Sequence, residues 1–200
     1  MSAIRKLYPA EADLLRTHLK RLDEEARRWR FGQPLTDEAI DRLVDDIDWL
    51  NSLHLGYFVD GTLRGSAQLV WKPWHWRDGA EFAVAIETPY QDHGVGTELL
   101  RRAASVARNR GIGQLQLFCQ GGNRRMLKVA LKFGAKLEAQ SGEVEGIVPL
   151  GGPSQASLFD EALGESAAWL NQWLGQIRLP ALLGPAFAPR PAAQDEPDAA

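Results

Sequence analysis

The sequence predicts an α/β (α+β) fold in which helices flank a sheet of several strands. Segments whose apolar residues recur with helical spacing are interleaved with segments in which apolar and polar residues alternate. In the middle of the chain, a strand pattern passes through a glycine-bearing turn directly into a long helix pattern. With 200 residues, of which 44% are hydrophobic and 24% charged, the chain can bury a core of its own.

Two helices are predicted in the first quarter of the chain. An apolar stripe from Leu14 to Leu22 follows Pro9, which suits a helix start. Thr36 is a suitable N-cap for the second helix, whose core side runs from Ile40 to Ile47. The arginine-rich segment 23–32 lies between them and is expected to be a polar link.

The strands are predicted from alternation and from turn residues. Asp60-Gly61 is a strong hairpin signal between strands at 53–59 and 63–70. A third strand, 81–86, leads into the glycine turn, and residues 4–7 are a candidate first strand.

The second half predicts alternating helices and strands. A helix follows the glycine turn and ends near Gly111, and a strand covers 114–119. Asn123 opens a short helix that stops at Gly134. Residues 135–150 form a final hairpin that turns at Ser141-Gly142.

The glycine turn is a candidate phosphate site. A strand, a glycine turn and a helix start leave backbone N–H groups unpaired at the positive end of the helix dipole, which favours phosphate or pyrophosphate. Gly94 and Gly96 let the backbone approach a ligand closely. The alternative is an ordinary turn that needs glycine for its backbone angles. The turn is Gln91-Asp92-His93-Gly94-Val95-Gly96-Thr97.

This turn is neither a P-loop nor a Gly-x-Gly-x-x-Gly fingerprint. It matches Gln/Arg-x-x-Gly-x-Gly/Ala, and so resembles the coenzyme A pyrophosphate loop of the GNAT superfamily of N-acetyltransferases. A second segment, Asn123 to Ala135, is similar to that family's Asn-x-x-Met/Ala pattern followed by Leu/Phe-Gly-Phe/Ala. The resemblance covers residues 3–150 and includes the order of elements.

A closer resemblance is to the acetyltransferase domain of bacterial protein-lysine acetyltransferases. The segments that carry it are 21–23, 27–31, 80–84 and Asn123-x-x-Met126. In those proteins the domain is sometimes fused to a large nucleotide-binding module. The present sequence lacks that module, so protein substrates do not follow automatically.

The resemblance implies a mixed, mostly antiparallel sheet that splays at the strand binding acetyl-CoA. It implies that the backbone of Val84, Ala85 and Ile86 pairs with the pantetheine arm as an added strand would. The residues expected to bind acetyl-CoA, the acetyl donor, are Val84, Ala85, Ile86, Gln91, Asp92, His93, Gly94, Val95, Gly96, Thr97, Asn123 and Met126.

Glu81 is the candidate general base. A lysine-like amine has a pKa near ~10.4 and must lose a proton before it attacks. The resemblance implies a glutamate on this strand, and Glu81 matches its place. The alternative is a surface carboxylate at the end of the strand. Glu87 is a weaker candidate base. The resemblance implies a tyrosine as general acid, but its position is taken by Ala130, which cannot donate a proton.

Composition and residue counts narrow the classes of partner and ligand that we expect. A net charge of −3 favours neither nucleic acid nor an anionic membrane as a partner. The single cysteine, Cys119, excludes an intrachain disulfide and fits a cytoplasmic location, and no apolar run predicts a signal peptide or a membrane span. The four histidines show no metal-ligand spacing, so no metal is expected.

Three regions are expected: an acetyltransferase domain at 1–150, a linker with an amphipathic helix at 151–184, and a disordered tail at 185–200. The apolar stripe from Trp169 to Ile177 must be buried, either on its own domain or across a homodimer. The expected function is acetyl transfer from acetyl-CoA to a primary amine, either a protein lysine or a small molecule. The rival from another class is a coenzyme A-binding regulatory module with reduced catalysis.

Overall fold

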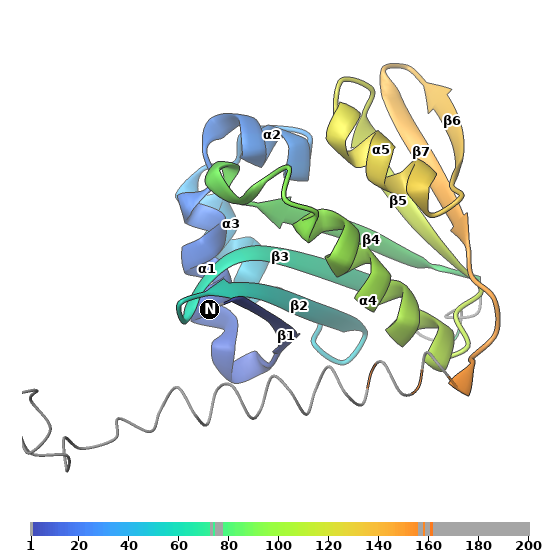
Figure 1. Ribbon diagram of the computed structural model, residues 1–200. Helices are drawn as coiled ribbons and strands as arrows, with labels where there is room; N and C mark the ends of the chain where they lie inside the picture. Colours follow the sequence, from blue (N-terminus) through green and yellow to red (C-terminus); the bar gives the residue numbers. More distant parts are fainter. Residues whose placement is uncertain (1, 73, 75–77, 156–157, 159–160, 162–200) are drawn as a thin grey trace, which may run out of the picture.

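A computed structural model of the chain describes residues 2–72, 74, 78–155, 158 and 161. Within these residues, seven strands form one sheet in the order β1-β2-β3-β4-β5-β7-β6 (Figure 1). All neighbouring strands are antiparallel except β4 and β5, which are parallel. The elements are β1 (Ser2–Leu7), α1 (Ala12–Arg21), α2 (Glu24–Phe31), α3 (Asp37–Asp45), β2 (Ser52–Val59), β3 (Thr62–Trp71), β4 (Ala80–Ile86), α4 (Val95–Asn109), β5 (Gln114–Gln120), α5 (Arg124–Lys132), β6 (Lys136–Gln140) and β7 (Glu143–Pro149).

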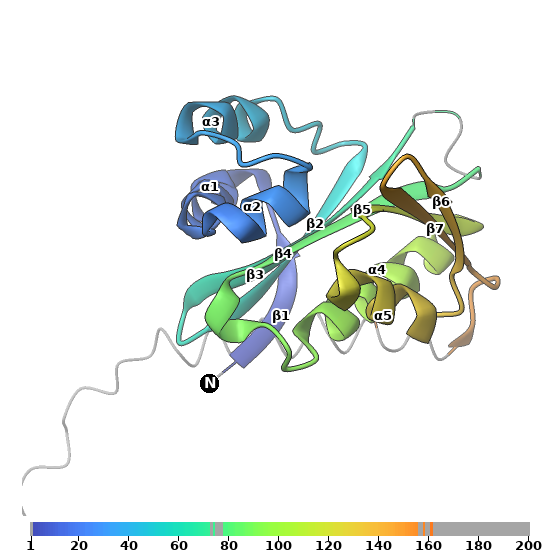
Figure 2. The same ribbon diagram turned by 90° about the horizontal axis from the view of Figure 1, so that it is seen from above.

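The sheet separates two groups of helices. Figure 2 shows α1, α2 and α3 on one face of the sheet and α4 and α5 on the other. Each face has its own apolar core, because alternate strand residues point to opposite faces. The larger core surrounds α4 and contains Phe82, Leu99 and Leu115; the smaller lies under α1 and α3 and contains Leu19 and Ile40.

The predicted turns and caps are confirmed. Asp60 and Gly61 both have positive φ, 47° and 77°, as a tight hairpin turn requires. The hydroxyl of Thr36 accepts a hydrogen bond from the amide of Ala39 and so caps α3. Gly134 follows α5 with a φ of 73°, which ends that helix as expected.

The expected link at 23–32 is wrong, because most of it is the helix α2. The carboxylate of Asp23 caps this helix by accepting from the Ala26 amide at 2.8 Å, and Gly32 ends it with a φ of 77°. The helix buries only Ala26 fully, so its apolar periodicity is too weak to predict it. Its position over β4 is decided by tertiary contacts, one of which joins the Thr88 hydroxyl to the Asp23 carboxylate.

The sheet opens between β4 and β5. Their parallel pairing covers only Ala80 to Phe82 on β4, although β4 continues to pair with β3 as far as Ile86. Beyond Phe82 the two strands diverge. The end of β5, from Phe118 to Gln120, pairs only with β7 among the described strands. The sheet is therefore splayed at β4, as the family resemblance implies.

The described part of the C-terminal region is small. Glu161 binds the domain through Lys6 on β1, at 3.0 Å, and Asn109 on α4, at 2.7 Å. The stripe from Trp169 to Ile177 and the segment 185–200 lie outside the described residues, so their expected helix and disorder stay predictions. No helix of the described part is long and apolar enough to span a membrane.

Candidate active site

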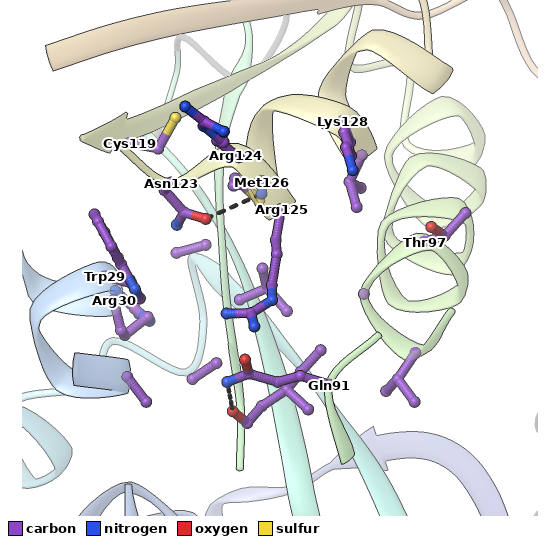
Figure 3. Close-up of a pocket in the computed structure, with 18 of the residues that line it drawn as sticks. Trp29, Arg30, Gln91, Thr97, Cys119, Asn123, Arg124, Arg125, Met126 and Lys128 are labelled. Carbon is purple, nitrogen blue, oxygen red and sulfur yellow. Dashed lines mark hydrogen bonds between the residues drawn. The ribbon is translucent and has the colours of Figure 1, made fainter. Parts of the chain in front are cut away.

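A cleft of about 360 Å³ lies where the sheet opens. It is bounded by β4, β5, the glycine turn, α4, α5 and the end of α2, and Figure 3 shows side chains from these elements around it. Eleven of the twelve residues expected to bind acetyl-CoA line this cleft. They are Val84, Ala85, Ile86, Gln91, Asp92, Gly94, Val95, Gly96, Thr97, Asn123 and Met126.

The glycine turn lines the cleft and leads into the N-terminus of α4. Gly94 is the N-cap of α4 with a φ of 79°, and no side chain caps the helix. Asp92 also has a positive φ, 60°, so consecutive amides of the turn form a concave surface. The side chain of Gln91 donates to the carbonyl of Ile86 at 2.8 Å and ties the turn to the end of β4. This local geometry suits an anion, and the anion site stays a prediction.

One edge of β4 is open along the cleft. Residues 83–86 pair with β3 on one side, but have no β5 partner on the other. Unpaired strand backbone is the surface to which an extended chain with amide groups can add. The pantetheine arm of coenzyme A has such amides, so the open edge fits it.

Four basic side chains on α5 line the cleft, and the sequence analysis did not identify them. They are Arg124, Arg125, Lys128 and Lys132. The sequence pattern that could have predicted them is the spacing of Arg124, Lys128 and Lys132 at i, i+4 and i+8, which places three cations on one face of a helix. Together with the glycine turn, these cations fit a ligand with several phosphates.

Asn123 has a structural role that explains its place in the motif. Its side-chain oxygen accepts a hydrogen bond from the amide of Met126 at 3.0 Å and caps α5 (Figure 3). The cap sets where α5 begins, and therefore where its basic side chains stand relative to the cleft.

Two predicted site residues do not line the cleft. His93 points instead to a neighbouring hollow that Tyr57 and Glu98 also line. Glu81 is exposed on β4, within the paired part of the strand, and lies opposite Val70 and Gln116. Its neighbour Phe82 belongs to the core around α4, so the Glu81 side chain points to the opposite face, which carries α1, α2 and α3.

That face of the cleft is formed by the end of α2 and by β5. Trp29, Arg30 and Phe118 line it, and Figure 3 shows Trp29 and Arg30 across the cleft from α5. The cleft therefore joins the two faces of the sheet through the gap between β4 and β5. A donor held on the α4–α5 side would meet an acceptor arriving from the α2 side.

Glu87, the weaker candidate base, is fully engaged in ion pairs. Its carboxylate contacts His18 Nδ1 at 3.1 Å, Arg21 Nε at 2.9 Å and Arg64 Nη1 at 2.9 Å. Burial alone would raise its pKa, but the hydrogen bonds from His18, Arg21 and Arg64 outweigh burial and lower the pKa to about 2. Such a carboxylate is a poor base near neutral pH, and it anchors α1 to the end of β4.

The structure shows no acid at the usual tyrosine position. Ala130 is buried in the core, 2% exposed, and does not line the cleft. Cys119 does line it, but burial raises the pKa of its thiol, which donates to the Val144 carbonyl at 3.7 Å. A neutral thiol is a poor nucleophile, so a covalent acetyl-cysteine route is disfavoured. Among the described residues, no group of three or more His, Cys, Asp and Glu side chains could hold a metal ion.

Comparison with known proteins identifies the family and the fold. A family model for the acetyltransferase (GNAT) domain matches residues 3–136. No curated protein sequence matches the chain significantly. The GNAT domain of S. lividans PAT superposes with a TM-score of 0.64 at 23% identity, over 74% of this chain and 89% of that one.

Two solved structures with bound coenzyme A are also similar in fold. PaiA N-acetyltransferase from Thermoplasma acidophilum, in complex with coenzyme A, has a TM-score of 0.57 at 21% identity, over 74% of this chain and 99% of that one. Spermidine N-acetyltransferase from Vibrio cholerae, with CoA and spermine, has a TM-score of 0.59 at 15% identity, over 73% and 93%. Because the family model spans most of the chain and the fold agrees, this protein belongs to the GNAT family and is an acetyl-CoA-dependent N-acetyltransferase.

Proposed function

We propose that the protein transfers the acetyl group of acetyl-CoA to a primary amine, with Glu81 as general base. The observation that carries this proposal is the cleft itself, which leads from the glycine turn through the open sheet to the face on which Glu81 stands. Donor and acceptor would then approach one strand, β4, from opposite faces of the sheet.

The donor would be held along its length. The turn amides and the α5 cations would receive its phosphates, and the open edge at Val84 to Ile86 would receive the pantetheine arm. One backbone amide of that edge would polarise the acetyl carbonyl and stabilise the oxyanion that forms on attack.

Glu81 would remove the proton from the acceptor amine. It lies three residues before Val84, which is roughly 10 Å along a strand, so the amine and an intervening water fit between them. The amine nitrogen forms a bond to the acetyl carbon while its proton passes through water to Glu81. The carbon–sulfur bond then breaks, and coenzyme A leaves as a thiolate, which with a pKa near ~8.5 needs little help from an acid.

A protein lysine is the leading acceptor, because segments 21–23, 27–31 and 80–84 are similar to the acetyltransferase domain of protein-lysine acetyltransferases. The fold similarity to the GNAT domain of S. lividans PAT supports this choice. A small-molecule amine is the alternative. The environment of Arg30, on the acceptor side, favours one chemical class of acceptor, whether small molecule or protein.

The test is a screen for thiol release from acetyl-CoA with a polyamine, free amino acids, lysine peptides and whole proteins as acceptors. The proposal expects at least one amine to be acetylated, with mass spectrometry locating the acetyl group on its nitrogen, and Glu81→Gln to lose most of this turnover. Tight binding of acetyl-CoA with no transfer to any amine would instead support a regulatory, coenzyme A-binding module.

A further inference from the structure

Arg30 is the basic side chain on the acceptor side of the cleft, and it differs from its neighbours in its partners. Arg16, Arg21, Arg27 and Arg28, the other arginines of α1 and α2, each have a carboxylate oxygen within 4.0 Å. Arg30 has no such partner among the described residues. Its Nη2 donates instead to the neutral side chain of Gln68 at 2.7 Å, and its guanidinium lies 5.0 Å from the centre of the Phe31 ring.

The guanidinium has lost much of its hydration. Although Arg30 is partly exposed as a residue, desolvation lowers its pKa to about 10, while the charge of Glu81 acts in the opposite direction. A cation that is removed from water and lacks an ion-pair partner is costly, unless a ligand supplies the missing anion.

Arg30 stands close to the expected site of transfer. Its partner Gln68 lies opposite Ala83 on β4, between Glu81 and Val84. Arg30 and Ala83 line the same cleft, and Arg30 also lines a small adjoining hollow together with Gln68 and His54. A group bound by Arg30 would thus lie beside the amine that Glu81 would deprotonate, and not beside the donor phosphates near α5.

We infer that Arg30 binds a carboxylate carried by the acceptor next to its reactive amine. This inference rests on the proposed amine acetylation and narrows its acceptor class. A guanidinium presents a planar fork of donors that matches a carboxylate. The same chemistry is available in a free amino acid and in an Asp or Glu beside a lysine of a protein. A polyamine lacks it, and its additional positive charges are repelled by Arg30.

The experiment measures kcat/KM for pairs of acceptors that differ only in a carboxylate. One arm uses ω-amino acids from glycine to 6-aminohexanoate, each against its C-terminal amide. The other arm uses lysine peptides flanked by Glu or by Gln. Rates are expressed per neutral amine, because an amide substituent lowers the pKa of a nearby amine and would otherwise bias the comparison.

For the wild type, we expect the better pair to favour the carboxylate by roughly 10- to 100-fold, as a partly desolvated charged hydrogen bond allows. In Arg30→Gln the ratio should fall to about one, and in Arg30→Lys it should keep part of its value because the charge remains. Arg28→Gln is the matched control, since Arg28 lies on the same helix and is paired with Glu24; it should leave the ratio unchanged.

Equal rates for acid and amide in the wild type would overturn the inference, as would a ratio that survives Arg30→Gln or a preference for spermidine over every carboxylate. If the wild type acetylates no amine, the proposed function fails; if it acetylates acids and amides alike, only the role of Arg30 fails. Should Arg30→Gln not fold, inhibition of the wild type by N-acetyl amino acids against their amides tests the same preference, and equal inhibition would contradict it.

Discussion

Arg125 and Asp92 face each other across the cleft, with 3.0 Å between Nε of the arginine and Oδ2 of the aspartate. The arginine comes from α5 and the aspartate from the glycine turn, so this exposed ion pair links the two elements expected to hold the donor phosphates. Figure 3 shows Arg125 extending from α5 toward Gln91 of the turn. In the protein without a ligand, Asp92 is thus paired with Arg125, an arginine that could otherwise bind a phosphate.

Asp92→Asn should therefore tighten acetyl-CoA binding. The substitution removes a negative charge from the phosphate site and releases Arg125, which for an exposed pair is worth up to about 1 kcal/mol, or roughly threefold to fivefold in Kd. Calorimetry at low salt measures the effect, which should shrink at high salt because exposed charges are screened. Asp13→Asn, which removes an exposed carboxylate from α1, is the control. Weaker binding by Asp92→Asn would contradict this role.

Substitutions at Gly96 should separate ligand contact from folding. Gly96 lies in the first turn of α4, and an added Cβ would meet Ile86 at 3.4 Å, so alanine fits the fold. We expect Gly96→Ala to keep or raise Tm, since alanine favours helix. Gly96→Leu should weaken acetyl-CoA binding at least about tenfold, because its side chain enters the cleft. Unchanged affinity in Gly96→Leu would refute the assignment of the turn.

Gly94 is the less informative position, although it lines the same cleft. Its φ of 79° strains any other residue by roughly 1–2 kcal/mol, even though an added Cβ meets no atom within 4 Å. Loss of affinity in Gly94 variants would therefore combine backbone strain with ligand contact. Thermal melts beside calorimetry distinguish the two contributions.

Glu81→Gln should bind acetyl-CoA normally and lower turnover about 10²- to 10⁴-fold near pH 7. The deficit should shrink as pH rises toward the amine pKa of ~10.4, because more acceptor is then already deprotonated. Rates over pH 7–10 measure this recovery, with Glu138→Gln on β6 as the control carboxylate. Wild-type turnover in the variant at pH 7 would make Glu81 a structural residue.

Glu87→Gln should destabilise the fold in a pH-dependent manner. The folded pKa of Glu87 is about 2, against an ordinary value of 4.5, so ionisation stabilises the native state above pH 4.5 and the benefit is lost as pH falls toward 2. The shift corresponds to at most about 3 kcal/mol of unfolding free energy near pH 7. Denaturant titrations should show the difference from wild type narrowing between pH 4.5 and 2.

The exposed Glu143 provides the control for this measurement. Glu143→Gln should leave the free energy of unfolding nearly unchanged at every pH. A difference between Glu87→Gln and wild type that persists undiminished at pH 2 would show that the variant acts through packing and not through the lost charge.

Removal of residues 155–200 should lower Tm by roughly 5 °C or more. The truncation deletes the contacts of Glu161 with Lys6 and Asn109, and also the apolar stripe from Trp169 to Ile177, whose two indoles are expected to be buried. Glu161→Gln alone should cause a smaller loss. Light scattering then separates the two expected locations of the stripe: a dimer that becomes a monomer on truncation indicates packing between chains. An unchanged Tm and an unchanged mass would contradict both.

Much of the fold follows from local sequence, because its signals act over a few residues. The Asp60-Gly61 turn, the Thr36 cap and the Asn123 cap each depend on side chains within four positions of the backbone that they serve. The glycine turn is of the same kind, which explains why a short motif could identify the cleft. Helix α2 was missed because it buries little apolar surface and gains its place from contacts with β4.

The sequence by itself determined the family, most of the order of the elements and the glycine turn, and the family resemblance implied the strand at which the sheet opens. Only the tertiary structure decided which charged side chains are free to act. Glu87 and Glu81 are both carboxylates near β4, but Glu87 meets Arg21 and Arg64, which are 66 and 23 positions away in sequence, and becomes a structural anion. Arg30 is one arginine of several in its segment until α2 packs on the sheet, where its guanidinium donates to the neutral side chain of Gln68. Burial and ion pairing are sums over neighbours that are distant in sequence, and the folded chain alone brings those neighbours together.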